Sequence, residues 1–406
     1  MRDMKEMLGI EEALKLTLES IERKGEETIA LADAGGRVAA RSLAAFVDSP
    51  SVDASLKDGY AVLSKEVEKA SPDHPVRLKV IGVTAAGGES SLRIFPGTTV
   101  RILTGARIPD NADAVLSEEF AVREGDWIEA FNVAEPGRNV LGRGSDVCAG
   151  REVVAGGTVL TPGLVGLLAA AGYSVVPVCE RPSVAIVATG DEVVLPGKPL
   201  PEGKLYASNL ATLDAWCKRY NMVSRMAAVP DRADAIESAL DRALAESDAV
   251  ITSGGAWTGD RDMVAGILRR MGWREVFHRI RIGPGKAVGF GLAGRKPVFL
   301  LPGGPPSNLT AFLQIALPGL LKLSGRTEVG LPTVVVRMAE EVHGRSVDWT
   351  QYLFGRIERR ESELLFHPLR SSSRLRSMAE AEAVAAIPEG EKWIAKGALV
   401  RAQWLL

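Results

Sequence analysis

Three stretches of sequence decide the fold of this chain: SVAIVATGDE at residues 183–192, AVITSGGAWTGD at 249–260 and VFLLPGGPPS at 298–307. Each begins with a continuous apolar run, which indicates a strand buried on both faces, as in parallel sheets covered by helices. A fourth strand is expected at 223–229, with helices at 210–220, 234–246, 263–271 and 307–323. The order of strands and helices predicts an α/β domain with a largely parallel sheet.

The loops after these strands carry glycine and carboxylate residues. Because the strands are parallel, their carboxyl ends meet at one edge of the sheet, and we expect the three loops to lie there together. Ligands of parallel α/β sheets bind beyond this edge. Glycine lets backbone N–H groups approach a phosphate, and carboxylates beside a phosphate require a hard cation, so Mg²⁺ is predicted. For any one loop, an ordinary glycine-containing turn is the alternative. The predicted substrate-binding residues are Thr189, Gly190, Asp191, Ser253, Gly254, Gly255, Gly259, Asp260, Pro302, Gly303 and Pro305, and the predicted metal ligands are Asp191, Glu192, Asp260 and Asp262.

A further anion site is predicted at Gly283-Pro284-Gly285-Lys286, which follows the basic run Arg279–Arg281. A lysine on a tight turn suits a phosphate or oxyanion, and the alternative is a solvated turn lysine. The turn is not a Walker loop, because the position that requires glycine is Ile280. No GxGxxG motif follows the first strand, which disfavours a nicotinamide enzyme.

The regions that flank the α/β domain are rich in short strand patterns. Residues 29–149 have β-branched runs cut by glycine and proline, and residues 328–406 predict a small β-barrel or sandwich. Helices are expected at 10–24 and 164–171. Asp58-Gly59 and Gly144-Ser145-Asp146 fit ordinary Asx turns, and local pattern alone assigns them no role.

The composition excludes several classes of protein. The 406 residues suggest two to four domains at roughly 150 residues each. A net charge of -2 argues against nucleic-acid and membrane-surface binding. There is no signal-peptide pattern, and the most apolar stretch, 160–178, is interrupted by glycine and proline, so no membrane span is expected. Three widely spaced cysteines without a CxxC pair predict a cytoplasmic protein with reduced thiols, and the four histidines lack zinc spacing.

Taken in chain order, the motifs resemble one family. They are Asp58-Gly59-Tyr60-Ala61, Arg101–Ala106, Ala112–Val115, Arg143–Asp146, Ala188–Glu192, Ser208-Asn209, Ser253-Gly254-Gly255, Pro284-Gly285-Lys286, Leu301-Pro302-Gly303 and Ser371–Met378. Each motif is short, but their order through nearly the whole chain is similar to that of the molybdopterin molybdenumtransferases, which include the E domain of gephyrin.

The resemblance implies a multi-domain fold: a linking helical and β domain (1–28 and 150–180), a β-rich insertion (29–149), an α/β molybdopterin-binding domain (181–327) and a C-terminal β-barrel (328–406). It also implies a reaction in which molybdate and adenylylated molybdopterin, with Mg²⁺, give molybdenum cofactor and AMP. An upstream molybdopterin adenylyltransferase would supply the adenylylated substrate. The protein would be a homodimer whose site is shared between subunits.

The resemblance also gives roles to particular residues. The family's acidic positions correspond to Asp58, Asp146, Glu192, Asp231 and Asp262, which together with Lys286 are the predicted catalytic residues. Site positions that bind substrate correspond to Thr104 and Ser373, and we add Arg279, Pro284 and Gly285 from the basic turn.

The chain departs from the family pattern at Lys57, Trp257, Gly283, Gly304 and Gln351. Gly283 replaces a lysine and Gln351 an arginine, so basic groups are missing around the expected phosphates. Two alternatives to a molybdenum-inserting enzyme therefore stay open. One is a weakened paralogue that acts as a molybdopterin carrier or scaffold, and the other is an insertase that prefers tungstate.

Overall fold

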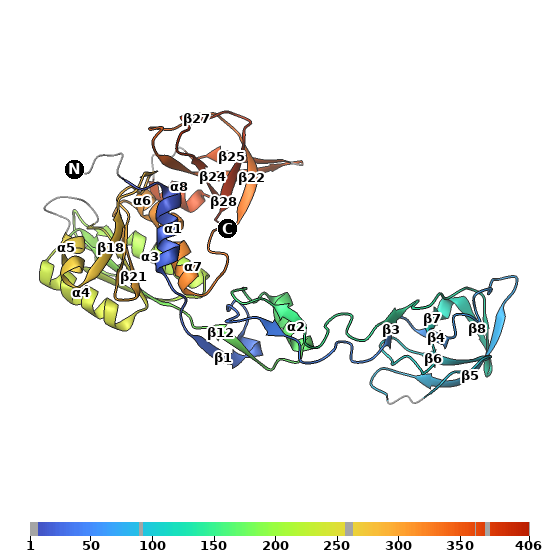
Figure 1. The fold of residues 1–406 in the computed structure, drawn as a ribbon. Coiled ribbons are helices and arrows are strands. Elements are labelled where there is room, and N and C mark those ends of the chain that lie inside the picture. Colours follow the sequence, from blue (N-terminus) through green and yellow to red (C-terminus); the bar gives the residue numbers. More distant parts are fainter. Residues whose placement is uncertain (1–6, 89–91, 256–262, 362, 370–373, 406) are drawn as a thin grey trace. The chain divides into compact units, whose positions relative to one another are not determined.

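The computed structural model describes residues 7–88, 92–255, 263–361, 363–369 and 374–405. The chain divides into two compact units. The first consists of Met1–Glu27, Gly157–Val159 and Val178–Leu406, and the second of Thr28–Gly156 and Leu160–Pro177. Figure 1 shows the two units and labels some of their helices and strands.

The first unit contains the predicted α/β sheet, with strand order β16-β13-β17-β21-β20-β18. Four neighbouring strands are parallel, as predicted: β16 (Val223–Val229), β13 (Ser183–Thr189), β17 (Ala249–Ser253) and β21 (Lys296–Leu301). Two antiparallel strands that the pattern did not predict, β20 (Gly289–Ala293) and β18 (Trp273–His278), extend the sheet. Glycine is rare in strands, but a Cβ on Gly291 would lie 2.4 Å from the Arg274 carbonyl oxygen. The sheet therefore requires glycine at position 291, and this glycine is also the reason why the sequence pattern does not predict β20.

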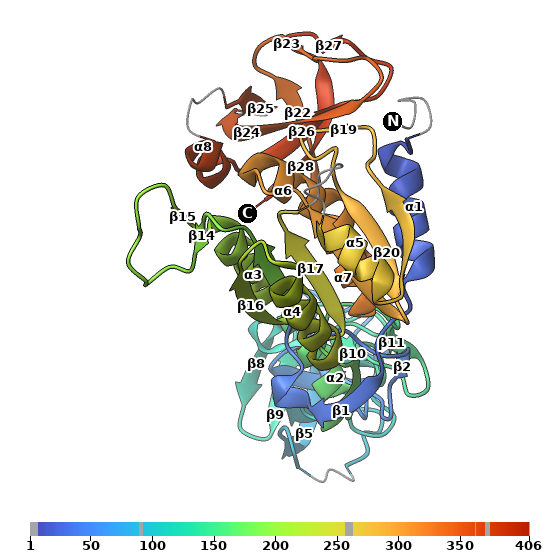
Figure 2. The ribbon, with the colours of Figure 1, turned by 90° about the vertical axis from the view of Figure 1, so that its left-hand side faces the viewer.

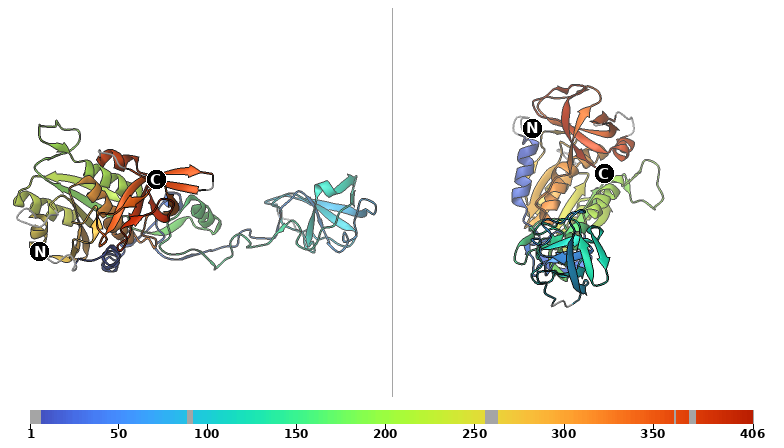
Figure 3. Two further views of the ribbon diagram at one scale, coloured as in Figure 1. Left: turned by 90° about the horizontal axis from the view of Figure 1, so that it is seen from above. Right: turned by 90° about the vertical axis from the view of Figure 1, so that its right-hand side faces the viewer.

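Helices cover both faces of this sheet. On β13, Ile186 belongs to the hydrophobic core that includes α3 (Ser208–Arg219), whereas the next residue, Val187, belongs to the core that includes α4 (Ala233–Glu246) and α5 (Met263–Arg270). Figure 2 shows α4 and α5 in front of the sheet. Helix α1 (Ile10–Ser20) contacts α7, β18 and β20, and it ends four residues before the predicted end. The right-hand view of Figure 3 shows this helix, in blue, beside the orange part of the sheet. The alternation of side chains along each strand produces these two cores.

The predicted helix 307–323 is observed as a helical run that begins two residues earlier. It consists of α6 (Pro305–Ala311), a π-helical turn (Phe312–Ala316) and α7 (Leu317–Leu323). Pro318 lacks the N–H that an α-helix needs at this point, so the regular hydrogen-bond pattern cannot continue through it. The run is buried over most of its length.

A β-barrel follows the α/β domain in the first unit. Its strands are β24 (Thr350–Arg360), β25 (Glu363–Pro368), β22 (Thr333–Met338), β28 (Leu399–Trp404) and β26 (Ala383–Ile387), and the pairing of β26 with β24 closes it. Smaller elements are β23 (Val342–His343), β27 (Trp393–Ile394) and α8 (Arg374–Glu380). Strand β19 (Ile282–Gly283) of the α/β domain pairs with β24, so the basic turn is joined directly to the barrel.

The second unit is β-rich, as predicted. Its main sheet has the order β7-β4-β6-β5-β9-β8. The strands are β4 (Gly59–Val62), β5 (Val76–Thr84), β6 (Thr98–Ile102), β7 (Ala114–Ser117), β8 (Ala121–Glu124) and β9 (Trp127–Ala130), and Tyr60, Leu78, Leu116 and Ile128 are in its core. Helix α2 (Pro162–Ala170) begins two residues earlier than predicted, because the Thr161 side chain caps it by accepting from the Leu164 N–H at 3.3 Å.

The remaining elements are short. They are β1 (Glu26–Ala30), β2 (Leu43–Ala44), β3 (Ala54–Ser55), β10 (Val140–Leu141), β11 (Glu152–Val154), β12 (Val175–Cys179), β14 (Val193–Val194), β15 (Leu205–Tyr206) and the 3₁₀ turns Leu31–Asp33 and Glu118–Phe120. Among the described residues, no helix has the length and apolar character needed to cross a membrane.

Candidate functional site

The three glycine-containing loops meet at the carboxyl edge of the parallel strands. The Gly254 N–H, just after β17, donates to the Leu301 carbonyl of β21 at 3.1 Å. Gly254 has a φ of +99°, and a Cβ there would lie 2.7 Å from the Thr189 carbonyl oxygen of β13. A side chain would therefore collide with the neighbouring loop, and only glycine permits this close approach.

Ser253 is at the centre of a hydrogen-bond network that ties these loops together. The Asn209 side-chain amide, at the start of α3, donates to the Ser253 hydroxyl (3.2 Å) and to the Gly303 carbonyl (2.8 Å). The Asn308 amide of α6 donates to the same hydroxyl (3.1 Å) and to the Pro302 carbonyl (2.9 Å). The sequence reasoning assigned no role to Asn308 and named Asn209 only within a motif. The sequence feature that could have identified both residues is an asparagine in the first turn of a helix that follows a strand-end loop.

Three of the predicted acidic residues gather beside this edge. The Asp191 carboxylate accepts from the Asp231 N–H at 3.1 Å. The Glu192 carboxylate lies over Gly190, where its oxygens would be 2.8–2.9 Å from an added Cβ. Burial raises the pKa of Asp231 above its ordinary value, and the negative charges of Asp191 and Glu192 raise it further. A cation would relieve this repulsion.

The described carboxylates do not by themselves form a complete metal site. In the part of the chain that the structure describes, no three His, Cys, Asp or Glu side chains are placed to share one ion. Carboxylate oxygens are the donors that Mg²⁺ prefers, so the chemistry of Asp191 and Glu192 fits the ion while their number does not. The other predicted ligands, Asp260 and Asp262, lie outside the described residues, as does Gly259.

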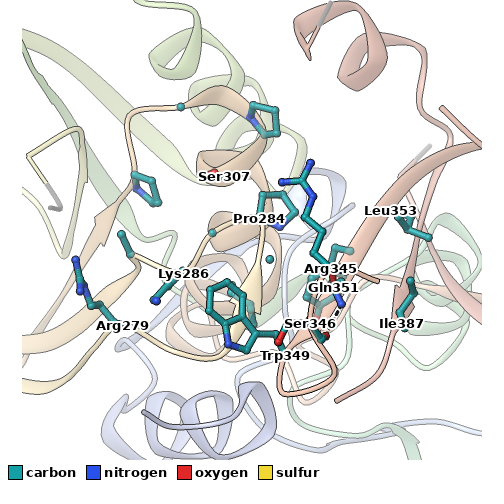
Figure 4. A pocket seen from close by; sticks show the side chains of 18 of the residues that line it. Arg279, Pro284, Lys286, Ser307, Arg345, Ser346, Trp349, Gln351, Leu353 and Ile387 are labelled. Atoms are coloured by element: carbon teal, nitrogen blue, oxygen red, sulfur yellow. Dashed lines mark hydrogen bonds between the residues drawn. The ribbon is translucent and has the colours of Figure 1, made fainter. Parts of the chain in front are cut away.

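The basic turn forms a second part of the site. Arg279 begins it with a φ of +73°, and its N–H donates to the Val288 carbonyl at 2.8 Å. Gly285 has a φ of +114° and packs against α6, because an added Cβ would lie 3.2 Å from the Ser307 carbonyl oxygen. The Lys286 ammonium lies 4.6 Å from the ring centre of Trp349 in the barrel, which is a cation–π contact (Figure 4).

A cavity of about 990 Å³ opens between this turn, the loop that ends β21 and the barrel. Its described lining contains three cationic residues (Arg279, Lys286 and Arg345), one histidine (His343) and neither aspartate nor glutamate. Of the predicted residues, Pro284, Gly285, Pro302 and Gly303 also line it, whereas Pro305 is not among the lining residues. The sequence reasoning missed the barrel's contribution from Arg345 and Trp349, because no pattern connects the barrel to the basic turn. A cavity with this balance of charge suits an anion.

The predicted residues of the second unit form their own local arrangements. The Asp58 carboxylate accepts from the Thr104 N–H and hydroxyl, both at 2.7 Å, and these hydrogen bonds hold the pKa of Asp58 below its ordinary value. Gly59 is required beside it, because a Cβ would lie 2.0 Å from the Leu116 carbonyl oxygen. The Asp146 N–H donates to the Ser49 carbonyl at 3.0 Å. Ser373, the remaining predicted site residue, lies outside the described residues.

A parallel α/β domain with glycine-rich strand ends, carboxylates and a basic cavity shared with a β-barrel defines a class of phosphorylated-ligand-binding proteins. Three family models together match most of the chain. They are the MoeA N-terminal region (domain I and II) at residues 8–172, the "probable molybdopterin binding domain" at 185–322 and the MoeA C-terminal region (domain IV) at 336–405.

Individual relatives agree with these models. A molybdopterin molybdenumtransferase of Nostoc sp. is 31% identical over 379 residues, which cover 91% of this chain and 87% of that protein. The enzyme of the same name from Bacillus subtilis is 29% identical, covering 94% and 90%. The crystal structure of the molybdopterin biosynthesis moeA protein from Pyrococcus horikoshii has a TM-score of 0.85 at 28% identity and covers 98% of this chain and 100% of that one. The chain belongs to the molybdopterin molybdenumtransferase (MoeA) family and is an enzyme.

Proposed function

We propose that this enzyme inserts molybdenum from molybdate into adenylylated molybdopterin, with release of AMP, in the biosynthesis of the molybdenum cofactor. The observation that carries the proposal is the 990 Å³ cavity, whose described lining is basic and without carboxylates, beside glycine-rich strand ends. Molybdate and phosphate are tetrahedral oxyanions, and both require cationic or N–H partners. Membership of the family supports the same assignment.

The parts of the site suit different parts of the substrates. In our proposal, the strand-end loops at Gly190 and Gly254 form the wall against which the phosphates lie, because glycine permits a close approach. The N–H groups of these two glycines themselves donate to the Val229 and Leu301 carbonyls. Arg279 and Lys286 hold anionic oxygens in the cavity and oppose the charge that develops there. Pro284, Gly285, Pro302 and Gly303 shape the cavity wall.

We also propose that Mg²⁺ assists the reaction. When bound, Mg²⁺ would neutralise phosphate charge beside Asp191, Glu192, Asp260 and Asp262. The support from the described residues is the raised pKa of Asp231 next to two other carboxylates. AMP release that is unchanged in excess chelator would contradict a role for the ion.

A homodimer with a shared site would explain why Asp58, Thr104 and Asp146, which belong to the second unit, match site positions of the family. We propose that these residues serve the α/β site of a second copy. Asp58→Asn and Glu192→Gln should each abolish AMP release, because each removes a charge while keeping the side chain's shape. Mixing the two variants should restore roughly a quarter of wild-type activity, since about half of randomly exchanged dimers are mixed and each has one intact site. Confirmed subunit exchange without recovery would contradict the shared site.

A cytoplasmic location and an upstream partner complete the proposal. The three cysteines are all free, which supports a reducing compartment. An adenylyltransferase acting on molybdopterin must supply the substrate, because the proposed leaving group is AMP.

The central test is AMP release by purified protein supplied with adenylylated molybdopterin, molybdate and Mg²⁺. We expect release with the wild type and a strong loss in Lys286→Ala, with Arg401→Ala as the control for removal of a basic residue outside the cavity lining. Tight molybdopterin binding without AMP release in the wild type would contradict the proposed reaction and would favour a carrier. Replacing molybdate with tungstate in the same assay tests the preference for the metal.

A further inference from the structure

We propose that Arg345, positioned by Gln351, is an additional oxyanion-binding residue of the cavity and acts together with Lys286 on the molybdate. The proposal rests on the proposed function for the identity of the anion. It adds one barrel residue that binds substrate, Arg345, and one that positions it, Gln351. Gln351 stands where the family has an arginine, and its side chain holds the loop that carries Arg345.

Gln351 lies on β24 and only 8% of it is exposed. Its amide bridges the loop that precedes the strand: the carbonyl oxygen accepts from the Arg345 backbone N–H at 2.5 Å, and the NH₂ group donates to the Ser346 carbonyl at 2.7 Å. Both ends of the amide are therefore used within the chain. Gln351 provides no charge to the cavity and instead fixes the backbone that carries Arg345.

Gly344 shows that this clamp is built into the loop. A Cβ on Gly344 would lie 2.3 Å from the Gln351 amide nitrogen, so any larger residue would displace the clamp. The Gly344 N–H also donates to the Lys392 carbonyl at 2.8 Å, which holds the other side of the loop. The loop is thus held on both sides, and the backbone position of Arg345 is fixed.

The Arg345 side chain lines the cavity and is exposed to solvent. Figure 4 shows it running from the barrel side of the cavity toward the side where Pro284 and Ser307 lie. Within the described ranges, no carboxylate forms an ion pair with its guanidinium, and no acidic residue lines the cavity. A guanidinium in this position can present two N–H groups to an oxyanion at once.

Lys286 is held in place by an aromatic ring rather than by a carboxylate. Its ammonium lies 4.6 Å from the centre of the Trp349 ring, and Trp349 belongs to the same loop as Arg345. Trp349 packs against the basic turn, because a Cβ on Gly283 would lie 3.6 Å from its Cε3 atom. The aromatic contact restricts the lysine without neutralising it, so both cations stay available to an anion.

Direct binding of molybdate to the full-length protein tests the proposal without the need for turnover. By equilibrium dialysis, Arg345→Ala should weaken molybdate binding about tenfold, which corresponds to about 1.4 kcal/mol, and Arg345→Lys should recover part of the loss. Gln351→Met keeps the side-chain length but removes both hydrogen bonds, so it should weaken binding severalfold although Arg345 is present. Arg401→Ala, the matched loss of one charge on barrel strand β28, should bind molybdate like the wild type.

Kinetics distinguish an anion contact from a merely structural role. Arg345→Ala should raise the KM for molybdate with little change in kcat, and its KM should depend less on salt than that of the wild type. Binding and KM that stay within twofold of wild type in a folded Arg345→Ala variant would overturn the proposal while leaving the proposed function intact. Arg345-dependent molybdate binding without AMP release would support the subsite and contradict the proposed function. A wild type that binds no molybdate would overturn the subsite.

Discussion

Replacement of Asn308 tests whether the buried amide network organises the site. The residue is 2% exposed and donates to the Ser253 hydroxyl and the Pro302 carbonyl. In Asn308→Ala, each lost hydrogen bond costs about 1 kcal/mol, and the penalty for leaving the buried carbonyl without this donor adds about 1–2 kcal/mol. We therefore expect a loss of about 3–4 kcal/mol in the local stability of the segment.

Asn209→Ala is the matched comparison. Asn209 donates to the same Ser253 hydroxyl and to the Gly303 carbonyl, but it is half-buried, so water can replace its hydrogen bonds. We expect a loss of about 1 kcal/mol there. Asn308→Leu keeps the volume of the side chain but donates no hydrogen bond, and it should be nearly as destabilising as Asn308→Ala because the polar partners are still unpaired.

Hydrogen exchange resolved by mass spectrometry is the suitable assay, because a chain of several domains does not unfold in one step. The opening free energies of peptides covering β17, β21 and α6 should fall most in Asn308→Ala, nearly as much in Asn308→Leu and least in Asn209→Ala. Equal effects of Asn308→Ala and Asn209→Ala would refute the reasoning about burial. Full rescue of stability by Asn308→Leu would show that packing, and not hydrogen bonding, dominates at this position.

Three further predictions follow from single contacts. Asp58→Asn should abolish AMP release and leave the circular dichroism spectrum unchanged, because an amide oxygen can still accept from the Thr104 N–H and hydroxyl. Iodoacetamide at pH 8 should modify the exposed Cys148 and spare the buried Cys217. Burial, and then the charge of Asp214, raise the pKa of the Cys217 thiol to about 12, so little reactive thiolate is present. Mass spectrometry that finds Cys217 alkylated first would contradict this prediction. Burial opposes ionisation of Asp248, but hydrogen bonds from Ser183 and the 2.9 Å ion pair with Lys24 outweigh it and lower its pKa, so the unfolded chain binds this proton more readily. The first unit should therefore lose stability as the pH falls below about 4, and Asp248→Asn should reduce that slope in urea unfolding.

Local pattern was enough to predict the parallel core and one edge of the site. The apolar runs at 183–188, 249–252 and 298–301 carry their own signal, because a strand buried on both faces cannot contain polar alternation. Strand polarity then required the glycine-rich loops to meet at one edge, where Gly254 contacts the loop of Thr189. The motif order similarly predicted the family, because it depends on residue identities and not on contacts.

Tertiary structure alone decided which groups meet across distant segments. The sequence pattern did not predict β20, and the Arg274 carbonyl of the neighbouring strand β18 is what requires glycine at position 291. The Asp58–Thr104 hydrogen bonds, the Asn308–Ser253 contact and the Lys286–Trp349 contact join residues 46, 55 and 63 positions apart. Gln351 reads as a lost cation in the sequence, whereas in the fold its amide holds the loop that carries Arg345. A hydrogen bond or cation–π contact depends on the distance between its groups and on their orientation, and only the packing of complete domains sets these two quantities.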